Sequence, residues 1–377
     1  MNIWAVIFFL SLYMIFHAYL GYPLTLLLLQ RFGKRSLQRK TITPSATLII
    51  TAFNEEKRIK EKLENSLQLD YPSRKLQIII ASDGSTDQTN AIVRSYADQG
   101  IELLEVKNRG GKENAQKEAV VHAKGEILVF SDVATILEPQ GLLEIVSNFA
   151  DPSVGCVSSE DCLLAQDGKP SGEGLYVRYE MWLRQLESHV NSLVGLSGSF
   201  FAARKEVCRD FSGDVQSDFR TLLSSMKIGL RGVSDPKAVG FYLDIADEKR
   251  EFERKVRTVL RGLTVFLNHL EFLNFFKYKL FSYQIFCHKL LRWFVPFFLA
   301  GAFLSNVLLV SSANFFVLLL AGQSIFYVLA LFGWTTRSLK GVLKIPTFFL
   351  VVNAAIAVAW WQYLTGKRVI MWVPSER

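Results

Sequence analysis

The chain has 377 residues, of which 50% are hydrophobic and 21% charged, and its mean hydropathy is +0.21. A membrane channel carries fewer charges and a soluble enzyme rarely has a positive mean hydropathy, so the average combines an apolar part with a charged part. The composition excludes a disordered, collagen-like or disulfide-scaffold chain. The net charge of +8 suits nucleic acid, anionic lipid or an anionic substrate. The four cysteines lack the spacing of a zinc site, which favours free thiols in a reducing compartment.

Residues 1–30 predict a membrane anchor. No Asp, Glu, Lys or Arg occurs between Ile3 and Gln30, and about 20 apolar residues suffice for a helix to cross a bilayer. A cleaved signal peptide is the alternative, but the run is too long and no small-residue cleavage site follows it. Basic residues follow directly and place this side of the membrane in the cytoplasm: Arg31, Lys34, Arg35, Arg39 and Lys40.

Residues 45–245 predict a soluble α/β domain in which β-rich runs alternate with helical segments. The strands are expected at residues 46–51, 76–81, 101–106 and 127–130, and the helices at residues 54–69, 87–96 and 112–123. This alternation predicts a mostly parallel sheet with helices on both faces. Ligands of such sheets bind beyond the carboxyl ends of the strands, so the polar residues at those ends are the candidate site residues.

The first two strands end in candidate nucleotide-binding residues. Phe53, Asn54 and Glu55 follow the first strand, although acidic residues here also suit the start of a helix. Asp83 and Gly84 follow the second strand. A tight turn accounts for Gly84 but not for Asp83, and a carboxylate at a strand end is well placed to accept from a base or ribose.

The next two strands are followed by a lysine and by an aspartate. Gly111 lets the backbone approach a phosphate and Lys112 adds a positive charge, although the P-loop pattern is absent and a solvated loop is the alternative. Asp132 can ligate a divalent cation that substrate phosphates also hold, or it can form an Asx turn.

Two later segments carry further candidates. Asp218 precedes a helical stretch and is a candidate general base, with Asp214 as its supporting acid or as a cap. Arg254, Arg257 and Arg261 share one helical face by their spacing. That face can clamp a diphosphate or meet anionic lipid.

The remaining chain returns to the membrane. Residues 246–291 mix Leu and Phe with charges, which predicts amphipathic interfacial helices; packing on the domain is the alternative. Residues 292–366 predict three membrane spans, the first two joined by a turn near residues 311–314. Residues 367–377 form a tail whose side of the membrane stays open. Because much of the positive charge follows the membrane boundary, no nucleic-acid partner is needed to explain it.

Taken in order, these segments resemble the membrane-bound family 2 glycosyltransferases, which include cellulose, chitin and hyaluronan synthases. The resemblance runs from about Thr47 to the last span. It implies a GT-A nucleotide-sugar-binding fold on the cytoplasmic face of a bacterial inner membrane, with a nucleotide-diphosphate sugar donor, a divalent cation (Mg²⁺ or Mn²⁺) and inversion at the anomeric carbon. It also implies a lipid-linked or glycan acceptor.

The resemblance assigns a role to each candidate residue. It implies nucleotide-sugar binding by Phe53, Asn54, Glu55, Asp83, Gly84, Lys112, Asp132, Arg254 and Arg257. It places a metal ligand at Asp132 and the catalytic base at Asp218. Three departures from the family pattern are Ala134 in place of a second metal-binding acid, Gln216-Ser217 before the base, and Thr258 in place of an acceptor-stacking Trp.

These observations predict an inverting membrane hexosyltransferase that uses a UDP-type donor in glycan or polysaccharide synthesis. A processive polysaccharide synthase is the first alternative, although Thr258 cannot stack on a sugar. A membrane scaffold with a degenerate transferase domain is the second. A transporter is the third, and the scarcity of ionisable residues in the spans disfavours it.

Overall fold

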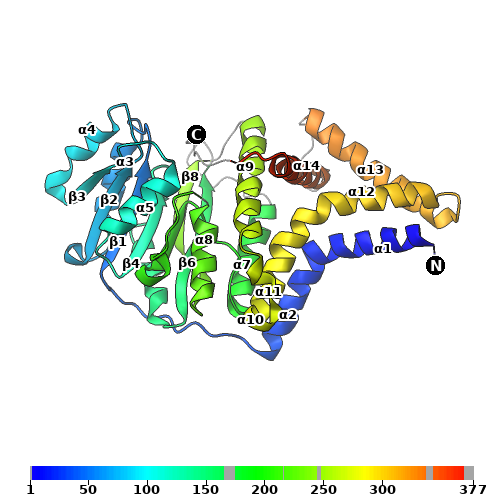
Figure 1. Ribbon diagram of the computed structural model, residues 1–377, viewed down its shortest axis with the longest axis horizontal. Helices are drawn as coiled ribbons and strands as arrows, with labels where there is room; N and C mark the ends of the chain where they lie inside the picture. Colours follow the sequence, from blue (N-terminus) through cyan, green and yellow to red (C-terminus); the bar gives the residue numbers. More distant parts are fainter. Residues whose placement is uncertain (1, 165–174, 215, 244–247, 337–342, 369–377) are drawn as a thin grey trace. The chain divides into compact units, whose positions relative to one another are not determined.

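The computed structural model describes residues 2–164, 175–214, 216–243, 248–336 and 343–368 (Figure 1). The chain forms two compact units. We call Leu29–Ala246 the sheet unit, and Met1–Leu28 together with Asp247–Arg368 the helical unit.

The sheet unit is built on an eight-stranded sheet within the described residues, in the order β3-β2-β1-β4-β7-β6-β8-β5. The strands are β1 Ala46–Ala52, β2 Leu76–Ser82, β3 Ile101–Glu105, β4 Ile127–Asp132, β5 Ile136–Leu137, β6 Val154–Leu164, β7 Phe200–Arg204 and β8 Arg231–Leu243. The pairs among β1, β2, β3 and β4 are parallel, and β7 runs antiparallel to β4 and β6. The predicted mostly parallel sheet is therefore confirmed.

Helices cover both faces of the central strands. All seven residues of β1 are buried, which requires cover on both sides of the sheet. The helices of this unit are α3 Ile59–Leu67, α4 Thr89–Arg94, α5 Lys112–His122, α6 Gly141–Ser147, α7 Leu175–Val190 and α8 Ser217–Lys227. α5 packs on β1 and β2, and α8 packs on β6 and β8; both lie in front of the sheet in Figure 1.

The register brings three strand ends to one edge. Thr51 pairs with Asp132, and Ala52 pairs with Ser82, so β1, β2 and β4 end at the same level. The loops that follow these strands therefore meet. Helix α3 begins five residues later than predicted because the chain turns first, with Asn54 at a φ of 52°.

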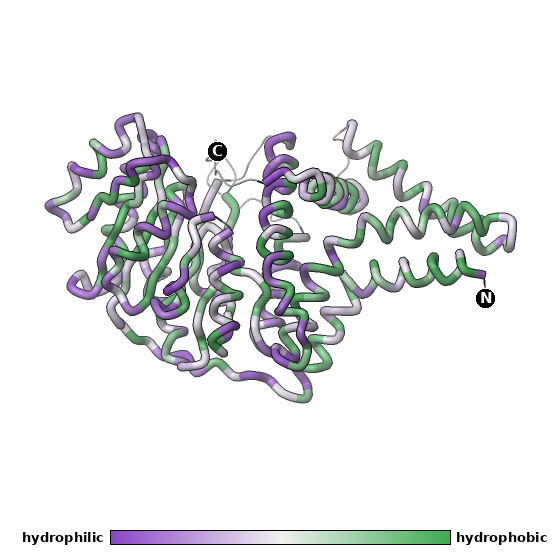
Figure 2. The backbone as a smooth tube through the Cα atoms, viewed as in Figure 1, coloured by the Kyte–Doolittle hydropathy of each residue, from purple (hydrophilic) through white to green (hydrophobic). Residues whose placement is uncertain are grey.

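The helical unit contains the long apolar helices (Figure 2). Within the described residues, four helices are long and apolar enough to cross a membrane, and one of them is near the N-terminus, as predicted. They cover Ile3–Phe32, Leu280–Leu309, Asn314–Thr336 and Lys344–Leu364. The first consists of α1 Ile3–Phe16, a π-helical turn at His17–Gly21 and α2 Tyr22–Phe32.

The second apolar helix starts earlier than the sequence indicated. It begins at Leu280, with α11 Leu280–Ile285, a π-helical turn at Phe286–Leu291 and α12 Arg292–Leu309. The boundary predicted at residue 292 falls inside this helix, and where the membrane begins along it stays a prediction. The turn predicted near residues 311–314 agrees with the gap between α12 and α13 Asn314–Thr336.

The segment predicted to be interfacial begins with α9 Glu248–Leu267, followed by a 3₁₀ turn at Leu270–Leu273 and α10 Phe275–Tyr278. α9 packs against α14 Lys344–Leu364, and the Lys255 ammonium lies 5.7 Å from the centre of the Phe348 ring. Phe276 is 97% exposed, as suits a side chain that meets lipid.

Candidate active site

Asp83 joins two of the loops at the edge of the sheet. Its side chain is 2% exposed, and its two carboxylate oxygens accept from the backbone amides of Gly110 and Gly111 at 2.9 and 2.8 Å. The carboxylate thus fixes the loop before α5 against the end of β2. Each oxygen keeps a second lone pair, so a ribose or base can still be recognised. The predicted ligand is therefore also a structural link, which its position after a strand did not indicate.

The loops after β1 and β2 are locked together by Asn54. Its side-chain oxygen accepts from the Thr86 amide at 2.8 Å, and its own amide donates to Ser85 Oγ at 3.1 Å. Gly84 in the same turn has a φ of 69°, a conformation that glycine adopts without strain. The sequence did not predict the contact of Arg109, whose guanidinium lies 3.7 Å from the centre of the Phe53 ring.

Glu55 serves the start of α3. Its side chain is buried and pairs with Arg58 at 2.7 Å, while its amide donates to Thr89 Oγ1 at 2.8 Å. Burial raises the pKa of Glu55, and the Arg58 guanidinium opposes the shift. The carboxylate is thus engaged within its own loop, and its predicted role at the nucleotide stays a prediction.

Lys112 and Asp132 form an ion pair. Lys112 is the first residue of α5, and Asp132 is the last residue of β4. The Lys112 ammonium also donates to the Gly198 carbonyl at 2.8 Å, and the Asp132 amide donates to the Ser199 carbonyl at 3.1 Å. The segment 195–199 therefore connects the ends of two predicted binding elements.

Asp218 lies against the same segment. It is the second residue of α8, and its carboxylate accepts from Gln216 Nε2 at 3.2 Å and from the Phe219 amide at 2.6 Å. A Cβ added to Gly198 would lie 2.8 Å from Asp218 Oδ2, so a larger residue at this position would require the carboxylate to shift. Lys112, Asp132 and Asp218 thus meet around Gly198.

Asp161 supports the segment from β6 and was not predicted. Its Oδ1 accepts from Ser197 Oγ and Ser199 Oγ, each at 2.6 Å. These serines flank Gly198, so the carboxylate holds the segment on both sides of the glycine. The sequence offered only the alternation of Ser and Gly as a signal.

Asp214 has different contacts from those considered for it. Its side chain is 69% exposed, it pairs with Arg220 at 3.8 Å, and it accepts from Ser212 Oγ. Among the described residues, the hydrogen bonds to the Asp218 carboxylate come from Gln216 and Phe219 rather than from Asp214.

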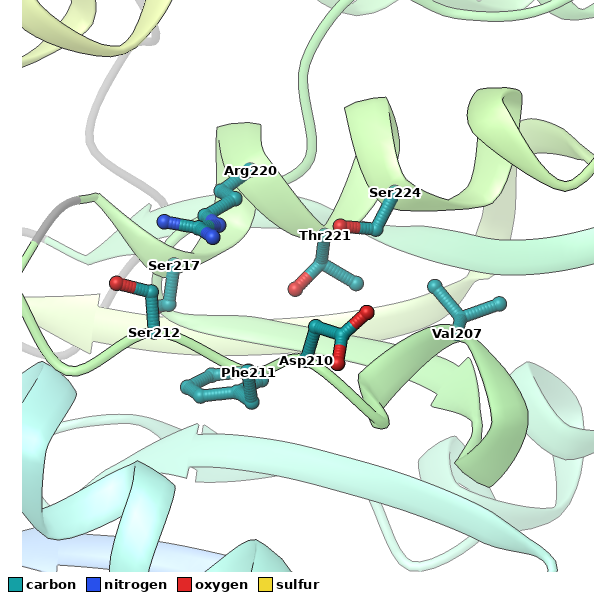
Figure 3. Close-up of a pocket in the computed structure, with 8 residues that line it drawn as sticks. All are labelled: Val207, Asp210, Phe211, Ser212, Ser217, Arg220, Thr221 and Ser224. Carbon is teal, nitrogen blue, oxygen red and sulfur yellow. The ribbon is translucent and has the colours of Figure 1, made fainter.

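Two pockets lie beside these elements. A small one is lined by residues of α8 and of the segment before it: Val207, Asp210, Phe211, Ser212, Ser217, Arg220, Thr221 and Ser224 (Figure 3). Its α8 residues lie on one helical face, and Asp218 is not among them. A more open pocket of about 470 Å³ is lined by Asn108, Arg109, Gly110, Asn114, Lys117, Ser212, Gly213 and Asp214. Because Gly110 binds Asp83, this second pocket adjoins the candidate nucleotide site.

The candidate metal ligand Asp132 stands alone. Among the described residues no group of three or more His, Cys, Asp or Glu side chains could hold a metal ion. Ala134 occupies the position of the expected second acid. Mg²⁺-type sites commonly use one or two carboxylates and take their other ligands from phosphates and water. The Asp132 side chain is 25% exposed, so it fits a cation that the substrate completes rather than a protein cage.

Arg254 and Arg257 belong to the helical unit. Arg254 makes a two-point ion pair with Glu251, at 2.6 and 2.8 Å. Burial lowers the pKa of Arg257, and the positive charges of Arg261 and Arg254 lower it further. An anion beside Arg257 would relieve this repulsion. Their predicted contact with a diphosphate stays a prediction.

Comparison with known proteins identifies the family of the central segment. Residues 47–210 match the glycosyl transferase family 2. This segment is a glycosyl transferase family 2 domain. The prediction of the family is therefore confirmed, and so is the enzyme class to which it belongs, the glycosyltransferases.

The family 2 domain has relatives with different products. A β-monoglucosyldiacylglycerol synthase of Synechocystis is 25% identical over 201 residues, which cover 50% of this chain and 42% of that protein. A poly-β-1,6-N-acetyl-D-glucosamine synthase of Staphylococcus epidermidis is 20% identical over 341 residues, which cover 83% of this chain and 82% of that protein. The chain thus spans less than half of the first relative and most of the second.

The fold agrees with that of a solved transferase. A mannosyltransferase from Pyrobaculum calidifontis, in complex with GDP-Man and Mn²⁺, has a TM-score of 0.75 and 22% sequence identity, and the match covers 96% of this chain and 100% of that one. This likeness confirms the GT-A fold.

Proposed function

We propose that this protein is an inverting membrane glycosyltransferase that moves a sugar from a nucleotide-diphosphate donor to a lipid-linked or membrane-presented acceptor. The observation that carries the proposal is the meeting of Lys112, Asp132 and Asp218 around Gly198. Transfer of a sugar from a diphosphate donor requires a positive charge for the leaving diphosphate, a carboxylate that can hold a metal ion, and a second carboxylate that can accept the proton of the acceptor. Lys112, Asp132 and Asp218 supply these three groups.

The Asp218 carboxylate takes the proton of the acceptor hydroxyl while that oxygen attacks the anomeric carbon, and the bond from this carbon to the diphosphate breaks. General-base assistance accelerates such a step by about 10²- to 10⁴-fold. The hydrogen bonds from Gln216 and from the Phe219 amide aim the carboxylate without filling all of its acceptor positions.

Lys112 serves the leaving group. Its ammonium exchanges the Asp132 carboxylate for the departing diphosphate, whose negative charge grows as the bond breaks. Asp132 would hold a divalent cation together with the diphosphate. When bound, the cation neutralises the charge that develops on the leaving oxygens. Asp83 and the loops it joins form the nucleotide end of the site. We propose a UDP-sugar as the donor.

The acceptor side is proposed from the membrane character of the chain. In the part of the chain that the structure describes, four helices are long and apolar enough to cross a membrane, and the two relatives above are named as makers of a glycolipid and of a polysaccharide. An acceptor held at the bilayer surface is consistent with the apolar helices and with the products of both relatives. We further propose that the chain resides in the bacterial inner membrane, with the sheet unit facing the cytoplasm, because basic residues follow the first apolar helix.

The test is the Asp218→Asn variant of the full chain, assayed for nucleotide release with UDP- and GDP-sugar donors and membrane extract as acceptor source. We expect kcat to fall by about 10³-fold with donor affinity nearly unchanged, because the amide cannot accept a proton. Asp98→Asn, the same change at an exposed position, is the control. A D218N protein that turns over at the wild-type rate would refute the assignment of the base.

A processive synthase is the second candidate, and the long match to the Staphylococcus epidermidis synthase favours it. Thr258 stands against it, because threonine cannot stack on a sugar of a growing chain. Product length decides: a single product supports the proposed transferase, and a ladder on a gel supports the synthase.

A further inference from the structure

Lys62 is a fully buried lysine beneath the loop that carries Asp132. It lies in the middle of α3, and its side chain is 0% exposed. Lysines are almost never fully buried unless they are paired. The Lys62 ammonium donates to Ser131 Oγ at 2.9 Å and to the Thr135 carbonyl at 2.5 Å. Lys62 therefore ties together the two ends of the loop 131–135.

α3 holds the next part of the chain as well. Asn65 donates to the Leu137 carbonyl at 2.8 Å and accepts from the Leu137 amide at 3.0 Å. Together with Lys62 it fixes the chain from Ser131 to Leu137 on one helix. The loop is therefore attached to the interior of the sheet unit by two side chains that never reach the site.

The hydroxyl oxygens of Thr51 and Thr135 are buried near Lys62 and make no hydrogen bond among the described residues, so the contacts of the ammonium are the polar links found here. Burial lowers the pKa of Lys62 to about 7, while the negative charge of Asp132 opposes the shift. The Lys62 ammonium and the Asp132 carboxylate thus lie close enough for their charges to interact.

We propose that Lys62 is a positioning residue for Asp132: it fixes the loop 131–135 from inside the fold so that a single carboxylate is presented to the diphosphate and its cation. The inference rests on the proposed function. A loop with Ala134 in place of a second acid has one carboxylate to place, so an error in its position is not compensated by a neighbour. Groups that orient a metal ligand typically change metal affinity by about 10- to 100-fold when they are removed.

The test compares K62M with K60M in the full-length protein. Methionine is an unbranched side chain only one atom shorter than lysine and has no hydrogen-bond donors, and Lys60 is on the same helix with a 69% exposed side chain. Mn²⁺ affinity is measured by the EPR signal of free Mn²⁺ in the presence of UDP and, separately, of GDP. We expect K62M to weaken Mn²⁺ binding by about tenfold and to lower kcat by a similar factor, while K60M matches the wild type.

A second comparison separates positioning from simple support of the fold. UDP and GDP affinity without Mn²⁺ should be unchanged in K62M, because its effect is local to the loop 131–135. A folded K62M protein with wild-type Mn²⁺ affinity would overturn the inference, whatever its stability. If K62M does not fold, S131A removes one of the two acceptors, and we expect it to weaken Mn²⁺ binding by about threefold, in line with the loss of one hydrogen bond. An S131A protein with wild-type affinity would overturn the inference equally.

The proposed function can fail separately. If the wild type binds neither UDP nor GDP, the proposed donor class is wrong, and amide exchange of residues 131–137 then decides the role of Lys62. Faster exchange in K62M than in K60M supports the positioning of the loop, and equal exchange rejects it.

Discussion

The nucleotide end and the reaction end of the site are built in different ways. At the proposed nucleotide end Asp83 and Asn54 accept hydrogen bonds from the backbone of neighbouring loops, and Glu55 accepts one from Arg58 in its own segment. At the proposed reaction end Asp132 pairs with Lys112, and a Cβ on Gly198 would lie 2.8 Å from the Asp218 carboxylate. Under the proposed function, we expect side chains of the first kind to shape the pocket and those of the second kind to take part in the chemistry.

Gly198→Ala breaks the reaction end most directly. The new Cβ would lie 2.8 Å from Asp218 Oδ2, so the carboxylate has to move. Catalysis is sensitive to displacements of about 1 Å, and we expect kcat to fall by about 100-fold. The backbone of Gly198 has no positive φ, so the stability should change little. The control is Gly33→Ala, where a Cβ meets nothing within 4 Å. A wild-type kcat in G198A would show that the reaction end tolerates displacement.

Asp83→Asn tests the nucleotide end. The amide nitrogen of the new side chain would face a backbone N–H, and at least one of two hydrogen bonds is lost. Leaving a buried donor unsatisfied costs about 1–3 kcal/mol. We expect a lower stability and a donor KM raised by about tenfold, with a smaller change in kcat. Steady-state kinetics over a range of donor concentrations separate the effect on KM from the effect on kcat. An unchanged KM with a reduced kcat would contradict the comparison, because Asp83 would then act in the chemical step.

Asp151 lies outside the candidate site, and we expect it to contribute to stability rather than to catalysis. Burial raises its pKa, but hydrogen bonds from Ser153 and Gln38 and the bond from Arg231 outweigh burial and lower the pKa to about 2. Its ordinary value is 3.8. Because the folded pKa lies below the unfolded one, the stabilisation is complete above about pH 4 and is lost as the pH falls through 2. The amount is about 2 kcal/mol, the equivalent of a shift of nearly two pKa units.

The measurement is denaturant unfolding of the wild type and of D151N at several pH values. The difference between the two proteins should be largest near neutral pH and should shrink between pH 4 and pH 2, while kcat at neutral pH stays close to the wild-type value in folded D151N. A difference that stays constant with pH would show that the Asp151 charge is not what stabilises this region.

The sequence predicted the first half of the sheet because its strands and helices alternate at short, regular distances. β1, β2, β3 and β4 lie within a few residues of their predicted places. The antiparallel β7 pairs with β4 and β6, and β6 pairs in turn with β8, so these strands come from distant parts of the chain. Pairing of that kind depends on the tertiary fold rather than on local periodicity.

The site divides in the same way. Lys112, Asp132 and Asp218 were predicted because each follows a recognisable boundary between a strand and a helix. Lys62, Asp161 and Arg109 were not, since a lysine within a charged helix reads as a solvent-facing residue and a carboxylate within a strand as a surface residue. Only the folded chain shows that Lys62 points inward and that Asp161 binds the serines on either side of Gly198.

The ion pair between Lys112 and Asp132 has one more consequence. Lys112 is already paired with the Asp132 carboxylate, so any anion that binds Lys112 has to compete with Asp132. An anion with a single charge offers Lys112 little that Asp132 does not already supply. A diphosphate offers more charge and can also draw a cation to the carboxylate that it displaces. Under the proposed function, we therefore expect the pair to set a threshold on ligand charge, so that a nucleotide diphosphate displaces Asp132 from Lys112 and a monovalent anion does not.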